Sequence, residues 1–239
     1  MTALARRAAR LEHRLTLPTA SLTDLDAAVA LVLAHGLPVL TVSPWLLDPA
    51  RRLLGRSGTR LATVIGAGHG GQIGPVKAYE ASLALAHGAR TVECVLNVGA
   101  LLSGDDATVL GDLLSVVEMA HAALAEAGVV IAASPLPAEV VRRACRLAEQ
   151  AGADYIVTSD GDADPERAIA LCALLRASAG PRLAVTASGR FASADEILRA
   201  MDAGATRVSA TFNDRLAAET VAALGLGSAG SSSTPAAVA

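Results

Sequence analysis

The sequence predicts a single (β/α)8 TIM barrel, an α/β fold, from three observations. Five times an alanine-rich amphipathic segment ends near a glycine and an apolar, often β-branched run follows, as in "LAHGLPVLTV", "LAHGARTVECVL", "AEAGVVIAAS", "EQAGADYIVTS" and "MDAGATRVSAT". Three more apolar runs, "RLEHRL", "RLATVIG" and "RLAVTAS", raise the number of candidate strands to eight. Eight alternations in one domain of this length, with strands apolar on both faces, favour a closed barrel over an open doubly wound sheet.

Each junction glycine is expected to be the residue after a helix end, in the left-handed conformation, with the next strand beginning beyond it. His35 and His87 precede two of these glycines and are expected to be polar caps at helix ends. The barrel should span residues 1–224, and the Gly-, Ser- and Ala-rich residues 225–239 should form a disordered tail. The expected strands lie at about residues 10–15, 38–43, 61–66, 90–97, 129–134, 154–159, 182–188 and 206–211.

Composition excludes several classes of function. Apolar residues make up 52% of the 239 residues and aromatics only 2%, so the core must consist of Ala, Val, Leu and Ile. A net charge of -3 provides no basic face for nucleic acid, and aromatic rings for base stacking are almost absent. The charged N-terminal stretch "MTALARRAARLEHRL" contains no apolar run long enough for a signal peptide or a membrane span.

The cysteines favour a reducing compartment. Cys94, Cys145 and Cys172 are far apart in the chain and odd in number, and none has metal-ligand spacing. We therefore expect a cytoplasmic protein with no metal and no cofactor. Its expected partner is a small-molecule metabolite, with or without a phosphate, and a homo-oligomer is compatible with the sequence.

In a barrel of this kind the chemistry lies at the carboxyl ends of the strands. The expected fourth strand, "TVECVLN", places Thr91, Glu93, Val95 and Asn97 on one face. A carboxylate buried there must be paired, hydrogen-bonded or protonated, because an isolated buried charge is too unfavourable. Two interpretations of Glu93 stay open: an internal ion pair with an arginine, or an acid/base group of an active site.

Two further stretches carry candidate groups. The first strand supplies Glu12, His13 and Arg14 in a row, and an acid beside a histidine at a barrel strand is a candidate for proton transfer. The loop "GAGHGGQIGP" at residues 66–75 is flexible enough to bind a ligand but lacks the lysine of a phosphate loop. His69 in that loop is expected to be exposed and without a functional partner.

The seventh strand ends in Ser188 and Gly189, and Ser193 with Glu196 has the spacing of a capping box at the start of the next helix. Backbone amides at that turn can hold a phosphate, as barrels often do after strands seven and eight. A capped helix with no ligand explains the same residues.

Taken in order, the segments "LEHRL", "LTVSP", "ATVIG", "VKAYEA", "VECVLNVGALLSG", "RRACRLAEQAGADYIVTS", "VTASG" and "DAGATRVSAT" resemble the deoxyribose-phosphate aldolase family over roughly residues 9–215. The resemblance implies a class I aldolase, which cleaves 2-deoxyribose 5-phosphate into acetaldehyde and glyceraldehyde 3-phosphate through a lysine Schiff base.

The residues that carry this chemistry in the family are changed here. The family's Schiff-base lysine, in the sixth-strand motif Val-Lys-Thr-Ser-Thr-Gly, matches Val157, and its second lysine, on strand seven, matches Thr186. The family's acid/base aspartate on strand four matches Glu93, which is one methylene longer. Its Asp-His-Thr on strand one matches Glu12, His13 and Arg14.

Two more motifs of the family are altered. A Glu-Thr pair on strand five matches Ala132 and Ala133, and the Gly-Ala-Ser-Ser after strand eight matches residues 209–212, which read Ser-Ala-Thr-Phe. An arginine cannot form the Schiff base, because a guanidinium is not deprotonated in a protein. Lys77 is the only lysine, and the resemblance puts it near the start of the third helix, where a solvated side chain is expected.

Three functional hypotheses follow. In the first, the chain is a divergent lyase or isomerase in which Glu93, with Glu12 or His13, transfers protons on a small carbonyl or hydroxylated metabolite. In the second it is a non-catalytic relative that binds a metabolite or a protein, and in the third it is an aldolase that uses Lys77 or the N-terminal amine. Substrate contacts are expected from Asn97, Thr158, Ser159, Asp160, Thr186, Ser188, Gly189 and Thr211.

The surroundings of Glu93 discriminate between the first two hypotheses. A sealed ion pair with an arginine, or apolar atoms around Val157 that fill the barrel, favours the non-catalytic one. Carboxylates that face an open cleft favour the enzyme.

Overall fold

A computed structural model describes residues 11–131, 136–159 and 161–225. Eight parallel strands form a closed barrel in the order β1 to β8, with β8 paired to β1. The predicted TIM barrel is therefore confirmed. Its strands are β1 (Leu11–Leu15), β2 (Val39–Val42), β3 (Arg60–Ile65), β4 (Thr91–Val95), β5 (Glu126–Val130), β6 (Tyr155–Val157), β7 (Ala184–Ser188) and β8 (Arg207–Ala210).

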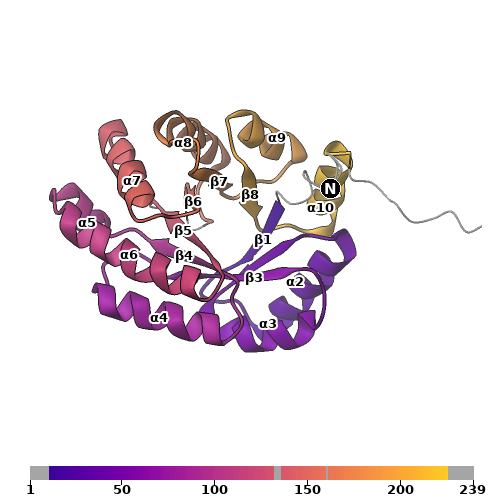
Figure 1. The fold of residues 1–239 in the computed structure, drawn as a ribbon. Helices are drawn as coiled ribbons and strands as arrows, with labels where there is room; N and C mark the ends of the chain where they lie inside the picture. The colour runs from indigo at the N-terminus through magenta and orange to yellow at the C-terminus, as the bar shows by residue number, and fades with distance from the viewer. Residues whose placement is uncertain (1–10, 132–135, 160, 226–239) are drawn as a thin grey trace, which may run out of the picture.

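Helices form an outer ring around the strands (Figure 1). They cover the apolar outer face of the barrel, because the faces of a parallel sheet are buried. Their bounds are α2 (Leu22–His35), η1 (Pro44–Leu46), α3 (Leu47–Leu54), α4 (Gly74–Ala86), α5 (Val98–Leu102), α6 (Asp106–Ala122), α7 (Ala138–Gln150), α8 (Pro165–Ser178), α9 (Ala194–Asp202) and α10 (Asp214–Ala223).

Most of the predicted helix ends are confirmed. Gly36, Gly88, Gly152 and Gly204 all have positive φ just after a helix. Ser193 and Glu196 form the predicted capping box at the start of α9. The two histidines at helix ends each contact a carboxylate. His35 Nε2 lies 3.1 Å from Asp214 Oδ1, and His87 Nδ1 lies 2.9 Å from Asp48 Oδ2.

The junction before the fifth strand was predicted wrongly. Helix α6 ends at Ala122, and Leu124 takes the positive φ of 56° that the prediction gave to Gly128. Gly128 lies inside β5, which starts three residues earlier than expected. A Cβ at Gly128 would stand 2.4 Å from the ring of Tyr155, so the glycine makes room for that ring.

Two separate apolar clusters form the core. The larger one fills the layer between the strands and the helices. The smaller one lies inside the barrel and consists of Val64, Val95, Val130, Tyr155 and Val157. Within the described ranges, no helix is long and apolar enough to cross a membrane.

Candidate functional site

The centre of the barrel holds a buried ion pair. Arg14 Nη2 donates to Glu93 Oε2 at 2.6 Å, and Tyr155 Oη donates to Glu93 Oε1 at 3.3 Å. The Glu93 side chain is fully buried and that of Arg14 is 2% exposed. Strand alternation brings these groups together, because residues two apart on a strand point to the same face of the sheet. Of the two interpretations of Glu93, the internal ion pair is the one observed.

Glu12 joins the same cluster. Its Oε1 accepts from Arg14 Nη2 at 3.1 Å, from Thr41 Oγ1 at 2.5 Å and from Ser209 Oγ at 2.9 Å. Arg14 Nε donates to Ser209 Oγ at 2.9 Å. Two carboxylates thus share one guanidinium in the lumen, which gives the three side chains a formal charge of -1.

Burial and mutual attraction oppose each other in this cluster. Burial raises the pKa of Glu93, and the neighbouring Arg14 guanidinium offsets only part of that shift. Burial alone would lower the pKa of Arg14, but the carboxylates of Glu93 and Glu12 raise it above its ordinary value. Burial, followed by the charge on Glu93, raises the pKa of Tyr155. The guanidinium therefore stays charged, and Glu93 takes up a proton more readily than an ordinary glutamate does.

Val157 lies in an apolar layer beside this cluster. It is fully buried, and it belongs to the same lumen cluster as Val64, Val95, Val130 and Tyr155. Branched aliphatic side chains thus surround the position that the resemblance gives to a lysine. Such an environment suits a packed barrel core.

The lumen also contains polar atoms that have no hydrogen-bond partner among the described residues. They are Glu12 Oε2, Arg14 Nη1, Thr91 Oγ1, Thr186 Oγ1 and Ser188 Oγ, each with almost no exposed surface. Ser188 and Ser209 are register partners on β7 and β8, and Ser209 contacts Arg14, so part of this set lies close together. Unpartnered buried polar groups are unfavourable and call for an explanation.

The end of β6 is tied to the end of β7. Thr158 Oγ1 and Ser159 Oγ donate to the carbonyl of Ser188 at 3.0 and 2.8 Å, and Thr158 Oγ1 also accepts from the Ser188 amide. Ser159 Oγ accepts from the Gly161 amide at 3.2 Å. Both hydroxyls are therefore engaged with backbone groups. Asp160, also predicted as a contact, lies outside the described residues, as do Ala132 and Ala133.

Backbone amides after strand seven are engaged as well. The Gly189 amide donates to the carbonyl of Ser209 at 3.2 Å. The amides of Ala192 and Ser193 donate to the carboxylate of Glu196 at 2.7 and 3.2 Å. The Glu196 carboxylate and the Ser193 hydroxyl thus bind amides at the start of α9 that could otherwise contact an anion.

His13 serves the turn after β8. It accepts a hydrogen bond at Nδ1 from the amide of Phe212 at 3.1 Å, and its ring lies 6.4 Å from the Phe212 ring. Burial lowers the pKa of His13 to about 4, although the nearby Glu12 acts in the opposite direction. His13 is therefore a neutral acceptor, and Nδ1 carries no proton in this arrangement.

The other predicted contacts are dispersed. The Asn97 side chain caps α5 by accepting from the Ala100 amide at 3.1 Å. Thr211 Oγ1 donates to the carbonyl of Arg14 at 3.1 Å. His69 is exposed, as predicted, and its Nδ1 accepts from the Gly71 amide at 3.0 Å.

Lys77 is not the solvated helix lysine that was predicted. It lies near the start of α4, but its side chain is completely buried. Its Nζ donates to Asp112 Oδ2 at 3.0 Å and to the carbonyl of Val95 at 3.2 Å. The lysine lies between α4, α6 and the end of β4, outside the lumen. Its burial is possible because Asp112 on α6 provides the countercharge.

The cysteines and the possible metal ligands do not form a reactive group in the described residues. All three cysteines are free and buried, and burial raises the pKa of Cys94 and Cys172 to about 12 and that of Cys145 to about 11. A thiolate nucleophile is thus disfavoured. Within the described part of the chain, no three His, Cys, Asp or Glu side chains lie in a group that could hold a metal ion.

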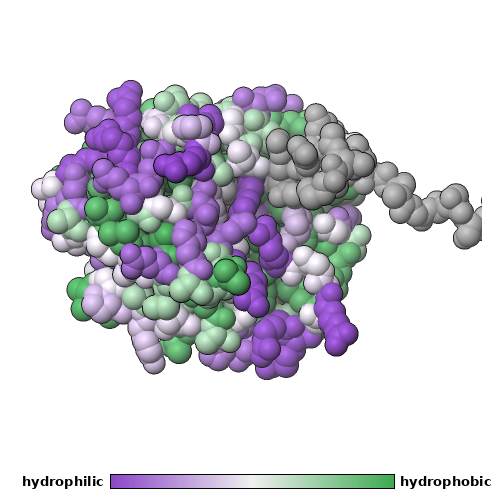
Figure 2. Space-filling model, viewed as in Figure 1, coloured by the Kyte–Doolittle hydropathy of each residue, from purple (hydrophilic) through white to green (hydrophobic). Residues whose placement is uncertain are grey.

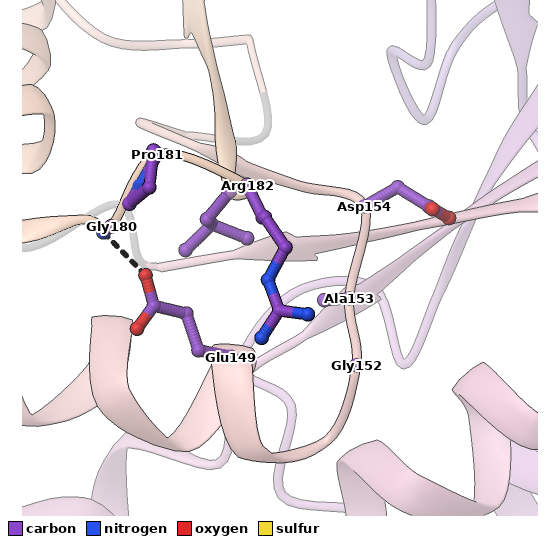
Figure 3. Close-up of a pocket in the computed structure, with 8 residues that line it drawn as sticks. Glu149, Gly152, Ala153, Asp154, Gly180, Pro181 and Arg182 are labelled. Atoms are coloured by element: carbon purple, nitrogen blue, oxygen red, sulfur yellow. Dashed lines mark hydrogen bonds between the residues drawn. The ribbon is translucent and has the colours of Figure 1, made fainter.

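A polar cavity of about 380 Å³ lies at the opposite end of the barrel, before β6 and β7 (Figure 3). Glu149 accepts from the Gly180 amide at its edge. Arg182 extends across it toward the helix that carries Glu149. Active sites of TIM barrels lie at the carboxyl ends of the strands. This cavity lies at the amino ends, so it is a less suitable place for a reaction.

Sequence reasoning missed three members of the lumen cluster. Tyr155 and Ser209 contact Glu93 and Glu12, and Arg207 stacks 4.8 Å from the centre of the Tyr155 ring. Arg207 also contacts Glu126 at 2.6 Å, which continues the charged chain to the amino-terminal end of the barrel. The signal was available in the alternation of strands six and eight, where Tyr155 and Val157, and Arg207 and Ser209, share a face.

A model of the DeoC/LacD family aldolases matches residues 5–214. The chain belongs to this family. The deoxyribose-phosphate aldolase of Mycolicibacterium paratuberculosis is 37% identical over 209 residues, which covers 85% of this chain and 92% of that protein. The homologue from Streptococcus pneumoniae serotype 19F is 34% identical over 198 residues, with 83% and 89% covered.

A solved structure agrees with this assignment at the level of the fold. The deoxyribose phosphate aldolase of Aeropyrum pernix, described as tetrameric, has a TM-score of 0.78 at 23% identity. The similarity covers 94% of this chain and 93% of that one. Family membership and fold are thus established together.

Proposed function

We propose that this member of the DeoC/LacD aldolase family does not perform the Schiff-base reaction and that its barrel has a non-catalytic, binding role. The observation that carries the proposal is the Arg14–Glu93 pair, closed at 2.6 Å with both side chains at most 2% exposed. The acid/base group of the family is thereby neutralised by a guanidinium inside the lumen.

The substitutions relative to the family remove two cations from the lumen and add another. The resemblance gives the family two lysines and a threonine where this chain has Val157, Thr186 and Arg14. Where the resemblance implies two lysines, on β6 and β7, this chain has one cation, Arg14 on β1. The added methylene of Glu93, relative to the family's aspartate, lengthens the acid that Arg14 holds. A guanidinium in this place can balance charge but cannot form an imine.

Lys77 gives little support to the third hypothesis. Its nitrogen is bound by Asp112 and by the Val95 carbonyl, and its side chain is fully buried outside the lumen. The N-terminal amine lies outside the described residues. A phosphorylated substrate is likewise disfavoured, because the amides of Gly189, Ala192 and Ser193 are bound within the chain.

Binding through the outer surface of the barrel, in the cytoplasm, fits these observations better than binding in the lumen. The Aeropyrum pernix relative is described as tetrameric, and self-association of this chain is one form that such binding can take.

The test is reductive trapping. The full chain is incubated with 2-deoxyribose 5-phosphate, or with acetaldehyde, in the presence of borohydride, and its intact mass is then measured. We expect no stoichiometric adduct, whereas the Mycolicibacterium paratuberculosis relative, treated in parallel, should be labelled. An adduct on the wild-type chain that disappears in Lys77→Arg would overturn the proposal in favour of the third hypothesis.

A matched variant separates a missing amine from a closed pocket. The double substitution Val157→Lys and Arg14→Thr returns the lysine and removes the guanidinium. If this variant forms the adduct and the wild-type chain does not, the loss of the reaction is attributable to these two positions. Circular dichroism and thermal melting establish that the variant is folded.

One observation favours the acid/base enzyme as a second candidate. Glu12 Oε2, Arg14 Nη1, Thr186 Oγ1 and Ser188 Oγ have no partner within the described part of the chain, and a small hydroxylated ligand would satisfy such groups. Thermal-shift measurements with a panel of small hydroxy and carbonyl metabolites address it. Stabilisation that is lost in Glu12→Gln and in Ser188→Ala would favour a lumen ligand over a purely surface-binding barrel, and only conversion of that ligand to a product would favour the enzyme.

A further inference from the structure

An apolar groove of about 210 Å³ lies between helices α7 and α8. It is lined by the buried side chains of Ile131 and Val141 and by the half-buried side chains of Leu136, Leu171 and Leu174. The groove lies outside the lumen, because Val130 belongs to the lumen cluster and Ile131, the next residue, faces the opposite side of the strand. We call it the α7–α8 groove.

Helix α8 supplies one whole side of this groove. Arg167, Ala170, Leu171 and Leu174 all line it, and their spacing of three, one and three residues places them on one side of the helix. An apolar stripe of this kind ordinarily packs against a neighbouring element. Here Ala170 stays exposed and the two leucines are only half-buried, so α7 covers the stripe incompletely.

The surface of α7 beside the groove is charged. Glu139, Arg142 and Arg146 are exposed, and Figure 2 shows deep purple, hydrophilic residues over this helix. The groove is therefore an apolar strip with a charged border. A molecule with one apolar part and one charged part matches such a boundary.

Arg167 is the one charged residue that lines the groove, and it is half-buried. Among the described residues its guanidinium has no ion-pair partner. Neighbouring arginines are engaged, since Arg143 contacts Asp106 at 2.6 Å and Arg176 donates to three backbone carbonyls. A guanidinium at the edge of an apolar groove is suited to a planar carboxylate, which it can bind through two hydrogen bonds.

The acidic residues at the start of α8 are occupied elsewhere. Both oxygens of Glu166 accept from Arg199 at 2.6 Å, and Asp164 accepts from the first amides of the helix. Helices α7 and α8 also both begin beside the groove, and the positive end of a helix dipole favours an anion. The local charge thus selects a negative group on the ligand.

We propose that the α7–α8 groove binds a small carboxylate with a short aliphatic chain. The carboxylate pairs with Arg167, and the chain lies between the leucines of α8 and Val141 of α7. Pockets for drug-sized ligands measure about 300–1,000 Å³, so about 210 Å³ suits a smaller molecule. The inference rests on the proposed function, because it gives a site and a ligand class to binding through the outer surface of the barrel.

The experiment is an NMR titration of the full chain, labelled at the methyl groups of Ile, Leu and Val, with octanoate as the probe. We expect the methyl signals of Ile131, Val141, Leu171 and Leu174 to shift together with one dissociation constant. In the series butanoate, hexanoate and octanoate, affinity should rise by up to about fourfold for each methylene group that the groove buries.

Two substitutions test the two halves of the site. Arg167→Gln should weaken octanoate binding about fivefold, because a half-exposed charge pair is lost, and should leave the binding of octanamide unchanged. Ala170→Leu adds three carbon atoms at the edge of the groove and should weaken the binding of both compounds by at least about tenfold. Thermal melting should find both variants folded, since neither side chain is fully buried.

Arg146→Gln is the matched control. Arg146 is an exposed arginine of α7 that does not line the groove, and its loss should leave octanoate binding as in the wild-type chain. The proposal is overturned if octanoate shifts none of the groove methyl signals, or if both Arg167→Gln and Ala170→Leu bind it as tightly as the wild-type chain. Equal affinity for octanamide would indicate an uncharged occupant and would also overturn it.

The trapping experiment on the proposed function has a separate readout. A borohydride adduct would overturn the proposed function without changing the octanoate affinity of the groove. Absence of octanoate binding would overturn this site alone, because it has no bearing on whether the chain forms a Schiff base.

Discussion

Two buried cations in this barrel make opposite arrangements with their carboxylates. Lys77 meets one acid, Asp112, and one backbone carbonyl between helices α4 and α6. Arg14 meets two acids, Glu12 and Glu93, inside the lumen. The first arrangement is balanced in charge, whereas the second keeps an excess negative charge. In the ranges that the structure describes, it also leaves Glu12 Oε2 and Arg14 Nη1 without partners.

The two ion pairs differ in charge balance, and this difference separates a structural pair from the cluster in the lumen. A balanced pair in the helix layer needs no explanation beyond packing. The unbalanced cluster in the lumen is lined with hydroxyls that have no partner among the described residues, and under the proposed function it is the remnant of a site that has lost its amines. The two pairs should therefore respond differently when one partner is removed.

The largest effect is expected from Arg14→Met. It leaves two carboxylates buried in the lumen with no cation, and breaking a buried pair in this way costs about 4 kcal/mol of unfolding free energy. Urea titration followed by circular dichroism measures it. A loss no greater than that of Lys77→Met would remove the distinction between the two pairs.

Glu93→Gln is the matched control within the same cluster. It changes the formal charge of the three side chains from -1 to zero at nearly constant volume. Because burial already raises the pKa of Glu93, the neutral amide should be tolerated far better than the loss of Arg14. If Glu93→Gln destabilises as much as Arg14→Met, hydrogen-bond geometry rather than charge governs the cluster.

Most of the fold, but not every glycine, could be predicted from the sequence. The barrel followed from periodicity and from glycines at helix ends, because both signals are local. Gly128 was misassigned because its role depends on the ring of Tyr155, a residue on the neighbouring strand. A glycine that ends a helix and one that admits a distant side chain look the same in sequence.

The site was partly predictable. Alternation along β4 predicted that Glu93 is buried on one face of the strand, and an ion pair with an arginine was one of its two predicted roles, but the sequence did not indicate which arginine. Thr158 and Ser159 are polar residues at a strand end, yet their hydroxyls bind the backbone of Ser188. Lys77 was expected in solvent because Asp112, 35 residues away, could not be paired with it from spacing alone.

The stability of the fold should also depend on pH, because β1 carries the neutral His13 between the two lumen residues Glu12 and Arg14. The pKa of His13 is about 4 in the folded chain against 6.5 for an ordinary histidine. The unfolded chain therefore binds the extra proton first, and stability that is complete above pH 6.5 is lost as the pH falls toward 4. The expected loss is about 3 kcal/mol.

His13→Asn isolates this effect, since the amide oxygen can still accept from Phe212 but does not titrate. Unfolding free energies of both proteins, measured between pH 7 and pH 4, should converge as the pH falls. Parallel curves would show that His13 does not link folding to pH.

The smallest effect is expected at the balanced pair. Lys77→Met leaves Asp112 without a cation, but that side chain is 7% exposed and borders the groove between α4 and α6, so water can reach it. We expect a loss of about 2 kcal/mol. Adding Asp112→Asn should recover most of it, because the double variant buries no charge. A double-mutant cycle in urea measures this coupling. Failure of the second substitution to recover stability would mean that the Lys77 contact with the Val95 carbonyl, rather than the ion pair, holds α4 to the barrel.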